Sequence, residues 1–142
     1  MRIIRIGILL SIAIFAIHFN SCGTPVNKNV KDKVKSFEEL TGRKITSRIR
    51  FANLKGRTVG LCIYGLNHVY LDKVYYDSAS DIQRTALIYH ELGHCECLSG
   101  HVDPKEFSFC PDSIMNATTT TDWCNRIKWN QYKTDLRKRC QK

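Results

Sequence analysis

The segment from His90 to His101, with the sequence HELGHCECLSGH, holds the strongest chemical signal in this chain of 142 residues. His90 and His94 are four positions apart, so on a helix both imidazoles leave the same face, one turn apart. This arrangement lets both rings bind one zinc ion, and Glu91 is positioned to deprotonate a water molecule at an open metal position. Because zinc lowers the pKa of its water to about 7, an active hydroxide exists at neutral pH. The spacing therefore predicts a Zn²⁺ site with hydrolytic chemistry.

A catalytic zinc site needs a third protein ligand. His101 follows a Ser-Gly pair, where the chain can end the helix and turn back toward the metal. Asp103 and Glu106 are the alternatives. The thiolates of Cys95 and Cys97 are also close in sequence, but Cys95 directly follows a predicted ligand and points about 100° away from it around the helix. Both cysteines are therefore expected to pack or to form disulfides.

Together with a downstream SIMNA segment, this pattern resembles the metzincins and related zincin peptidases. It also looks like small bacterial and phage-associated peptidases in which six residues separate the second and third histidines. The resemblance covers about residues 81–118 and implies zinc-dependent peptide hydrolysis. It implies that the metal ligands are His90, His94 and His101. It further implies that Glu91 is the general base and that Met115 forms a methionine turn beneath the metal.

The sequence departs from the metzincin pattern at two places. Metzincins have five residues between the second and third histidines, with a glycine third, whereas this chain has six, and Cys97 takes that place. The loop before His101 must therefore follow a different path. Ala117 stands where the methionine turn often has proline, which reduces rigidity without changing the chemistry. Zincins often line the substrate cleft with an edge strand, and the run from Leu61 to Tyr70 is the candidate for it.

The surrounding sequence predicts an α+β fold: a small twisted zincin-like sheet, an active-site helix, a methionine turn and a C-terminal helix. The active-site helix is expected over residues 81–98, with an N-cap between Ser78 and Asp81. A last helix is expected from 120–122 onward, with Trp123, Ile127, Tyr132 and Leu136 on one face. Short strand-like runs cover 45–54, 59–64 and 68–71, and Val34–Leu40 is weakly helical.

The N-terminal residues are typical of an export signal. Two arginines precede an apolar run that is shorter than a membrane span, so residues 1–21 are predicted to be a signal peptide rather than an N-terminal membrane anchor. The following FNSC segment resembles a bacterial lipobox, which predicts lipidation of Cys22, although a secreted protein with Cys22 in a disulfide is the alternative. Residues 22–35 are expected to be a polar tether and 36–142 the folded domain.

Six cysteines remain if Cys22 is lipidated, and an even number in an exported small domain predicts disulfides. Six cysteines allow 15 connectivities, and the sequence does not choose among them. They are Cys62, Cys95, Cys97, Cys110, Cys124 and Cys140. The net charge of +9 falls to +7 without the two signal arginines, but the basic residues are dispersed and no nucleic-acid-binding motif accompanies them.

Two functions remain after these considerations. The first is a zinc metalloendopeptidase that acts on a protein or peptide substrate and is held at the membrane by a lipid anchor, in the periplasm or at the cell surface. The second is a non-catalytic lipoprotein that zinc stabilises and that binds an envelope partner, which accounts for the ligands without using Glu91. Nucleic-acid binding is not expected.

Overall fold

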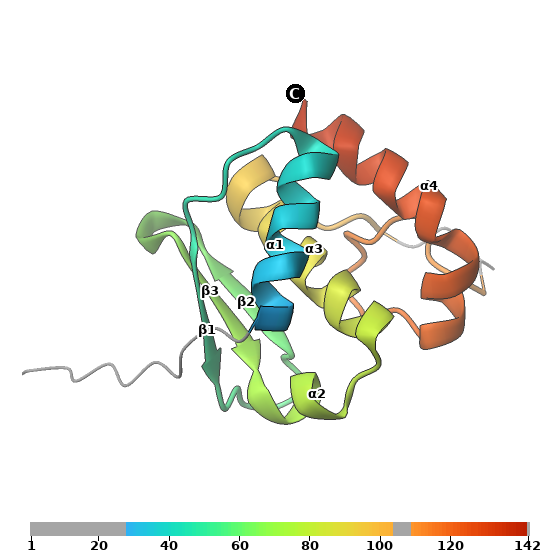
Figure 1. The fold of residues 1–142 in the computed structure, drawn as a ribbon. Helices are drawn as coiled ribbons and strands as arrows, with labels where there is room; N and C mark the ends of the chain where they lie inside the picture. Colours follow the sequence, from blue (N-terminus) through green and yellow to red (C-terminus); the bar gives the residue numbers. More distant parts are fainter. Residues whose placement is uncertain (1–27, 104–108, 142) are drawn as a thin grey trace, which may run out of the picture.

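The computed structural model describes residues 28–103 and 109–141 and has an α+β fold (Figure 1). Its sheet has three strands in the order β1-β3-β2, which are β1 (Arg48–Ala52), β2 (Gly60–Ile63) and β3 (His68–Asp72). β1 runs parallel to β3, and β2 runs antiparallel to β3. In this strand order β2 is the outer strand on one side of the sheet. The three strand-like segments of the sequence are confirmed, the first two within narrower bounds and the third one residue longer than predicted.

Within the described residues, four α-helices and one 3₁₀ turn complete the fold: α1 (Lys28–Thr41), the turn Tyr64–Leu66, α2 (Lys73–Ser78), α3 (Asp81–Cys97) and α4 (Asp122–Cys140). Helix α3 is central, because it contacts β2 and β3 as well as α1 and α4 (Figure 1). The short helix α2 was not predicted. It directly follows β3, whose last residue caps it by accepting a hydrogen bond from a backbone N–H of the first turn.

Local sequence signals define both ends of α3. The Ser80 hydroxyl accepts a hydrogen bond from the Gln83 N–H, and the Gln83 side chain accepts one from the Ser80 N–H, which forms a capping box. At the other end, Leu98 adopts a left-handed conformation with φ of 51°, and its N–H donates to the carbonyl of Gly93. The predicted active-site helix is thus confirmed to within one residue.

Helix α1 enlarges the folded domain beyond its predicted start. The sequence predicts a tether that ends at residue 35, but α1 already begins at Lys28. Val30 and Phe37 are fully buried, and Val34 packs against the same core. These apolar residues recur four and three positions apart, so they share one helix face, and burying that face stabilises the whole helix. The expected tether is therefore too long by eight residues.

The buried face of α4 also differs from the prediction. Tyr132 and Leu136 are fully buried, whereas Trp123 and Ile127 are each 54% exposed. At 100° per residue, Tyr132 lies half a turn around the helix from Trp123, so these four residues do not form one face. The buried face instead begins with Cys124 and continues through Tyr132 and Leu136.

Three disulfides fix the elements around α3. They join Cys62 to Cys95, Cys97 to Cys140, and Cys110 to Cys124. The first connects β2 to α3, the second connects the ends of α3 and α4, and the third connects the preceding loop to the start of α4. The bonds span 33, 43 and 14 residues, and loops of this size stabilise a fold by about 3–4 kcal/mol each.

Candidate metal centre

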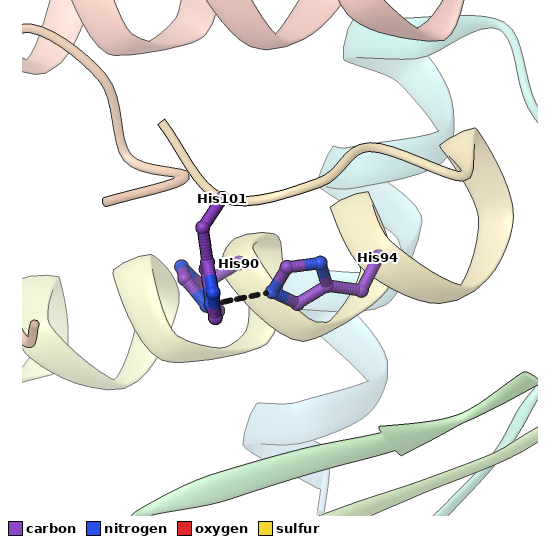
Figure 2. Close-up of side chains that lie close together, drawn as sticks. All are labelled: His90, His94 and His101. Atoms are coloured by element: carbon purple, nitrogen blue, oxygen red, sulfur yellow. Dashed lines mark hydrogen bonds between the residues drawn. The ribbon is translucent and has the colours of Figure 1, made fainter. Parts of the chain in front are cut away.

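Three histidine side chains converge beside α3 (Figure 2). His90 and His94 leave the same face of the helix, and His101 reaches the same point from the segment that follows it. The Nε2 atom of His94 lies 3.0 Å from that of His90 and 3.1 Å from that of His101. The Nε2 atoms of His90 and His101 are 3.3 Å apart. The three nitrogens therefore form a nearly equilateral triangle.

This triangle fits three ligands of one tetrahedral metal ion. With metal–nitrogen bonds of 2.0–2.1 Å, tetrahedral geometry places two ligand nitrogens about 3.3 Å apart. The observed separations of 3.0–3.3 Å are close to that value. Three protein ligands leave one tetrahedral position for a water molecule or a substrate, which is the pattern of catalytic rather than structural sites.

Backbone carbonyls orient two of the three rings. The Nδ1 atom of His90 lies 2.7 Å from the carbonyl oxygen of Ile114, and the Nδ1 atom of His94 lies 2.6 Å from that of Ser99. Because a carbonyl only accepts, each Nδ1 is the N–H donor and each Nε2 keeps its lone pair for a metal. Burial lowers the pKa of His90 to about 4 and also lowers that of His94, so both rings are neutral at pH 7.

Hydrogen bonds of the turn at residues 113–116 support this arrangement. The Ser113 hydroxyl accepts a hydrogen bond from the Met115 N–H, and the Ser113 carbonyl accepts one from the Asn116 N–H. The Met115 carbonyl in turn accepts from the Val102 N–H at 2.8 Å. The segment that follows α3 is thereby attached to the same turn that supplies the Ile114 carbonyl to His90, so one turn positions histidines from two segments.

Gly93 allows the turn to lie close against the helix. Met115 is fully buried, and a Cβ atom at position 93 would lie 2.6 Å from its Sδ atom and 3.1 Å from Leu136 Cδ1. Only a residue without a side chain allows this approach. The methionine predicted from the SIMNA segment thus contacts the helix one residue before His94.

Glu91 projects toward β2. Its carboxylate accepts a hydrogen bond from the Cys62 N–H, and its Cδ atom would lie 2.7 Å from a Cβ at position 60, which is why Gly60 is needed there. Glu91 is only 4% exposed, and burial raises its pKa to about 7. A carboxyl group with this pKa can both accept and release a proton near neutral pH. Neither Gly60 nor the Cys62 amide was identified from the sequence, since both contacts cross between separate elements.

The described alternatives, which are Asp103, Cys95 and Cys97, are not part of this cluster. Asp103 is exposed, and within residues 28–103 and 109–141 the group that could hold a metal ion consists of the three histidines alone. Cys95 and Cys97 are in disulfides, so neither offers a thiolate, in agreement with the structural role expected for them. Glu106 lies outside the described residues.

A cleft of about 750 Å³ lies along the cluster. α3 forms one wall with residues that include His90, Glu91 and His94, and His101 lies at the same cleft. β2 borders it on one side, and the segment 116–120 borders it on another. The cluster and Glu91 therefore share one solvent-connected space, which is large enough for a segment of peptide.

The three disulfides indicate that the protein resides in an extracellular or other oxidising compartment. They use all of the cysteines except Cys22. Within the described ranges, no helix has both the length and the apolar character needed to span a bilayer. The predicted signal peptide and Cys22 lie outside the described residues.

The fold and the site together define an α+β protein with a three-histidine cluster that could hold a metal ion. Comparison with family models, curated proteins and solved structures gives no match to the chain. The function is therefore inferred from the chemistry of the site.

Proposed function

We propose that the protein is a zinc-dependent peptidase that hydrolyses peptide bonds, with His90, His94 and His101 as metal ligands and Glu91 as general base. The observation that supports this most strongly is the convergence of three imidazole Nε2 atoms in the cleft that also contains the Glu91 carboxylate. Three imidazole ligands with one remaining position suit zinc. A purified protein with one zinc per chain would meet the first requirement of this proposal.

The residues of the chain have distinct tasks in the reaction. Bound zinc would supply Lewis acidity, which polarises the substrate carbonyl and makes water acidic enough to attack it. The Glu91 carboxylate accepts the proton of the attacking water and passes it to the nitrogen of the leaving amine. The Cys62 N–H holds this carboxylate by a hydrogen bond, and the packing against Gly60 limits its movement.

The substrate is proposed to bind as an extended peptide along β2. This strand is at the edge of the sheet, because it pairs with β3 on one side only among the described strands. It also borders the cleft. An extended peptide can add to such an edge through backbone hydrogen bonds, which bind it largely independently of its sequence. Unfolded protein or peptide is therefore the expected class of substrate.

The proposed location is the bacterial cell envelope, with a lipid on Cys22. The three disulfides support export, and the predicted signal peptide is followed by only a few residues before α1. Metabolic labelling with a lipid precursor tests this directly. Cys22→Ala should abolish the labelling and release the protein from membranes. Labelling that persists in this variant would contradict the lipobox interpretation.

Glu91→Gln is the decisive test, because it separates a peptidase from a non-catalytic zinc protein. The substitution keeps the size of the side chain and removes the base. We expect zinc content to stay at one per chain and hydrolysis of unfolded protein to fall by about 10²–10⁴-fold. Glu39→Gln, the same substitution on the exposed face of α1, is the matched control and should leave both quantities unchanged.

Two results would contradict the proposal. Loss of zinc in Glu91→Gln would make Glu91 a metal ligand rather than the base. Zinc-loaded wild-type protein that cleaves no protein or peptide would favour the non-catalytic envelope lipoprotein.

A further inference from the structure

The cleft continues beyond the three histidines toward the N-terminal end of α3. β2 runs alongside this helix, because Gly60 packs against Glu91 and Cys62 is bonded to Cys95. Both strand and helix therefore advance in the same direction, and residues 57–59 lie beside the first half of α3. The cleft is lined there by side chains from α3 and by the residues that precede β2.

Asn125 contributes to the wall of the cleft from α4. The start of α4 lies near the start of α3, because the side chains of Ser80 and Asp122 are in contact. Asn125 is completely buried, and its Oδ1 atom accepts a hydrogen bond from the Thr120 hydroxyl. Its Nδ2 atom has no partner within residues 28–103 and 109–141. A buried amide with two unused N–H groups is rare in folded proteins and matches a ligand that brings an acceptor.

Arg57 lines the same cleft from the segment that precedes β2. It is exposed, lines the cleft, and forms no hydrogen bond or ion pair in the described part of the chain. Among the described lining residues, Arg57 is the one with a permanent positive charge. Apolar side chains of Val59, Ala86 and Leu87 also line the cleft. This part of the cleft thus combines apolar walls with unused donors and one cation.

We propose that this region, which we call the carboxylate subsite and define by Arg57 and Asn125, binds a carboxylate of the peptide substrate. The inference rests on the proposed peptidase function and specifies its substrate class. The guanidinium of Arg57 attracts the anion, the amide of Asn125 donates to it, and the apolar walls contact the methylene groups that precede it. The carboxylate belongs either to an acidic side chain near the cleaved bond or to the C-terminus of the peptide.

Peptide binding tests the subsite separately from catalysis. The full mature protein with Glu91→Gln is loaded with zinc and titrated calorimetrically with pairs of peptides whose ends are blocked. The two peptides of a pair differ only by Glu or Gln at one position, and this position is varied from pair to pair around the cleaved bond. A further pair has no acidic residue and differs only in a free or amidated C-terminus. One carboxylate-containing peptide should bind about 10-fold more tightly than its neutral partner. The pair that shows the difference identifies the source of the carboxylate.

Two variants assign the preference to this subsite. Arg57→Gln should reduce the ratio of the two affinities, carboxylate peptide over neutral peptide, to about 2-fold or less. Arg48→Gln should leave this ratio unchanged, because the substitution removes the same charge from β1 at the opposite edge of the sheet. Asn125→Asp keeps the size of the buried side chain and replaces the donor by an acceptor. If it folds, as circular dichroism would show, it should also lower the affinity for the carboxylate peptide by about 10-fold or more.

The outcomes distinguish the subsite from the peptidase. Equal binding of all paired peptides, or a preference that Arg57→Gln leaves intact, would overturn the carboxylate subsite even if the wild-type protein cleaves peptides. A carboxylate preference that Arg57→Gln abolishes would support the subsite even if the wild-type protein cleaves none of them.

Discussion

Gly93→Ala tests whether close packing beneath the helix maintains the histidine cluster. The new Cβ atom would lie 2.6 Å from Met115 Sδ, and ordinary contacts begin at 3.4 Å, so the sulfur must move by about 0.8 Å. Met115 is fully buried, and Leu136 Cδ1 blocks part of the available space at 3.1 Å. The substitution therefore compresses the core between α3, α4 and the turn at residues 113–116.

The expected effect on stability combines two opposing terms. Overpacking a well-filled core costs about 1–3 kcal/mol. Replacing glycine by alanine inside a helix recovers up to about 1 kcal/mol. The net loss is about 1 kcal/mol, which corresponds to a Tm lower by about 4 °C for a domain of this size. Movement of Met115 also displaces the neighbouring Ile114 carbonyl that orients His90. Loss of such a ligand-orienting hydrogen bond lowers metal affinity by about 10-fold or more.

Thermal denaturation in the presence of a chelator measures the first effect, and competitive zinc titration measures the second. Gly100→Ala is the control, because a Cβ at position 100 would meet no atom within 4 Å. It should leave both Tm and zinc affinity close to the wild-type values. If Gly93→Ala were as stable as Gly100→Ala and bound zinc equally well, the contact between Met115 and α3 would not support the metal site.

Three other predictions follow from single contacts. Gly60→Ala should displace the Glu91 carboxylate and lower peptide hydrolysis by about 10²-fold while zinc content stays constant, as metal analysis and activity assays would show. Replacing both Cys97 and Cys140 by serine should lower the free energy of unfolding by about 4 kcal/mol in urea titrations, and an unchanged value would contradict the bond between α3 and α4. In metal-free protein, the raised pKa of Glu91 lowers stability as pH rises from 4.5 to about 7, whereas the lowered pKa of His90 raises stability from about 4 to 6.5. Urea titrations with a chelator should therefore show that the free energy of unfolding of Glu91→Gln rises by about 3 kcal/mol between pH 4 and 6.5. In the wild type the two opposed effects nearly cancel, so its free energy of unfolding should change little over this range.

The central part of the candidate metal site was predictable from the sequence. His90 and His94 share a face because the helix repeats every 3.6 residues, and α3 contains no proline and begins at a clear capping signal. Such signals act between residues that are close in the chain. The sequence does not determine the position of His101, because the path of its segment depends on the hydrogen bond between Val102 and Met115, which joins two separate segments.

The elements whose bounds or buried face differ from the sequence-based prediction also depend on contacts between separate segments. The sequence predicts the start of α1 six residues too late, because the core that covers Val30 is formed by other elements of the fold. The buried side of α4 was misjudged at Trp123 because its apolar character suggested burial, whereas the packing against α3 selects the opposite face. Apolar residues do occur on protein surfaces, so composition alone does not decide which side of a helix is covered.

The sequence by itself determined the helix with two histidines four positions apart, the acid between them, and the presence of six cysteines able to pair. The tertiary structure decided which cysteines pair, that Glu91 faces Gly60 and the Cys62 amide, and that Asn125 lines the same cleft as residues 57–59. The reason is physical: a helical repeat is set by neighbouring residues, whereas these contacts join elements that are brought together only when the hydrophobic core forms.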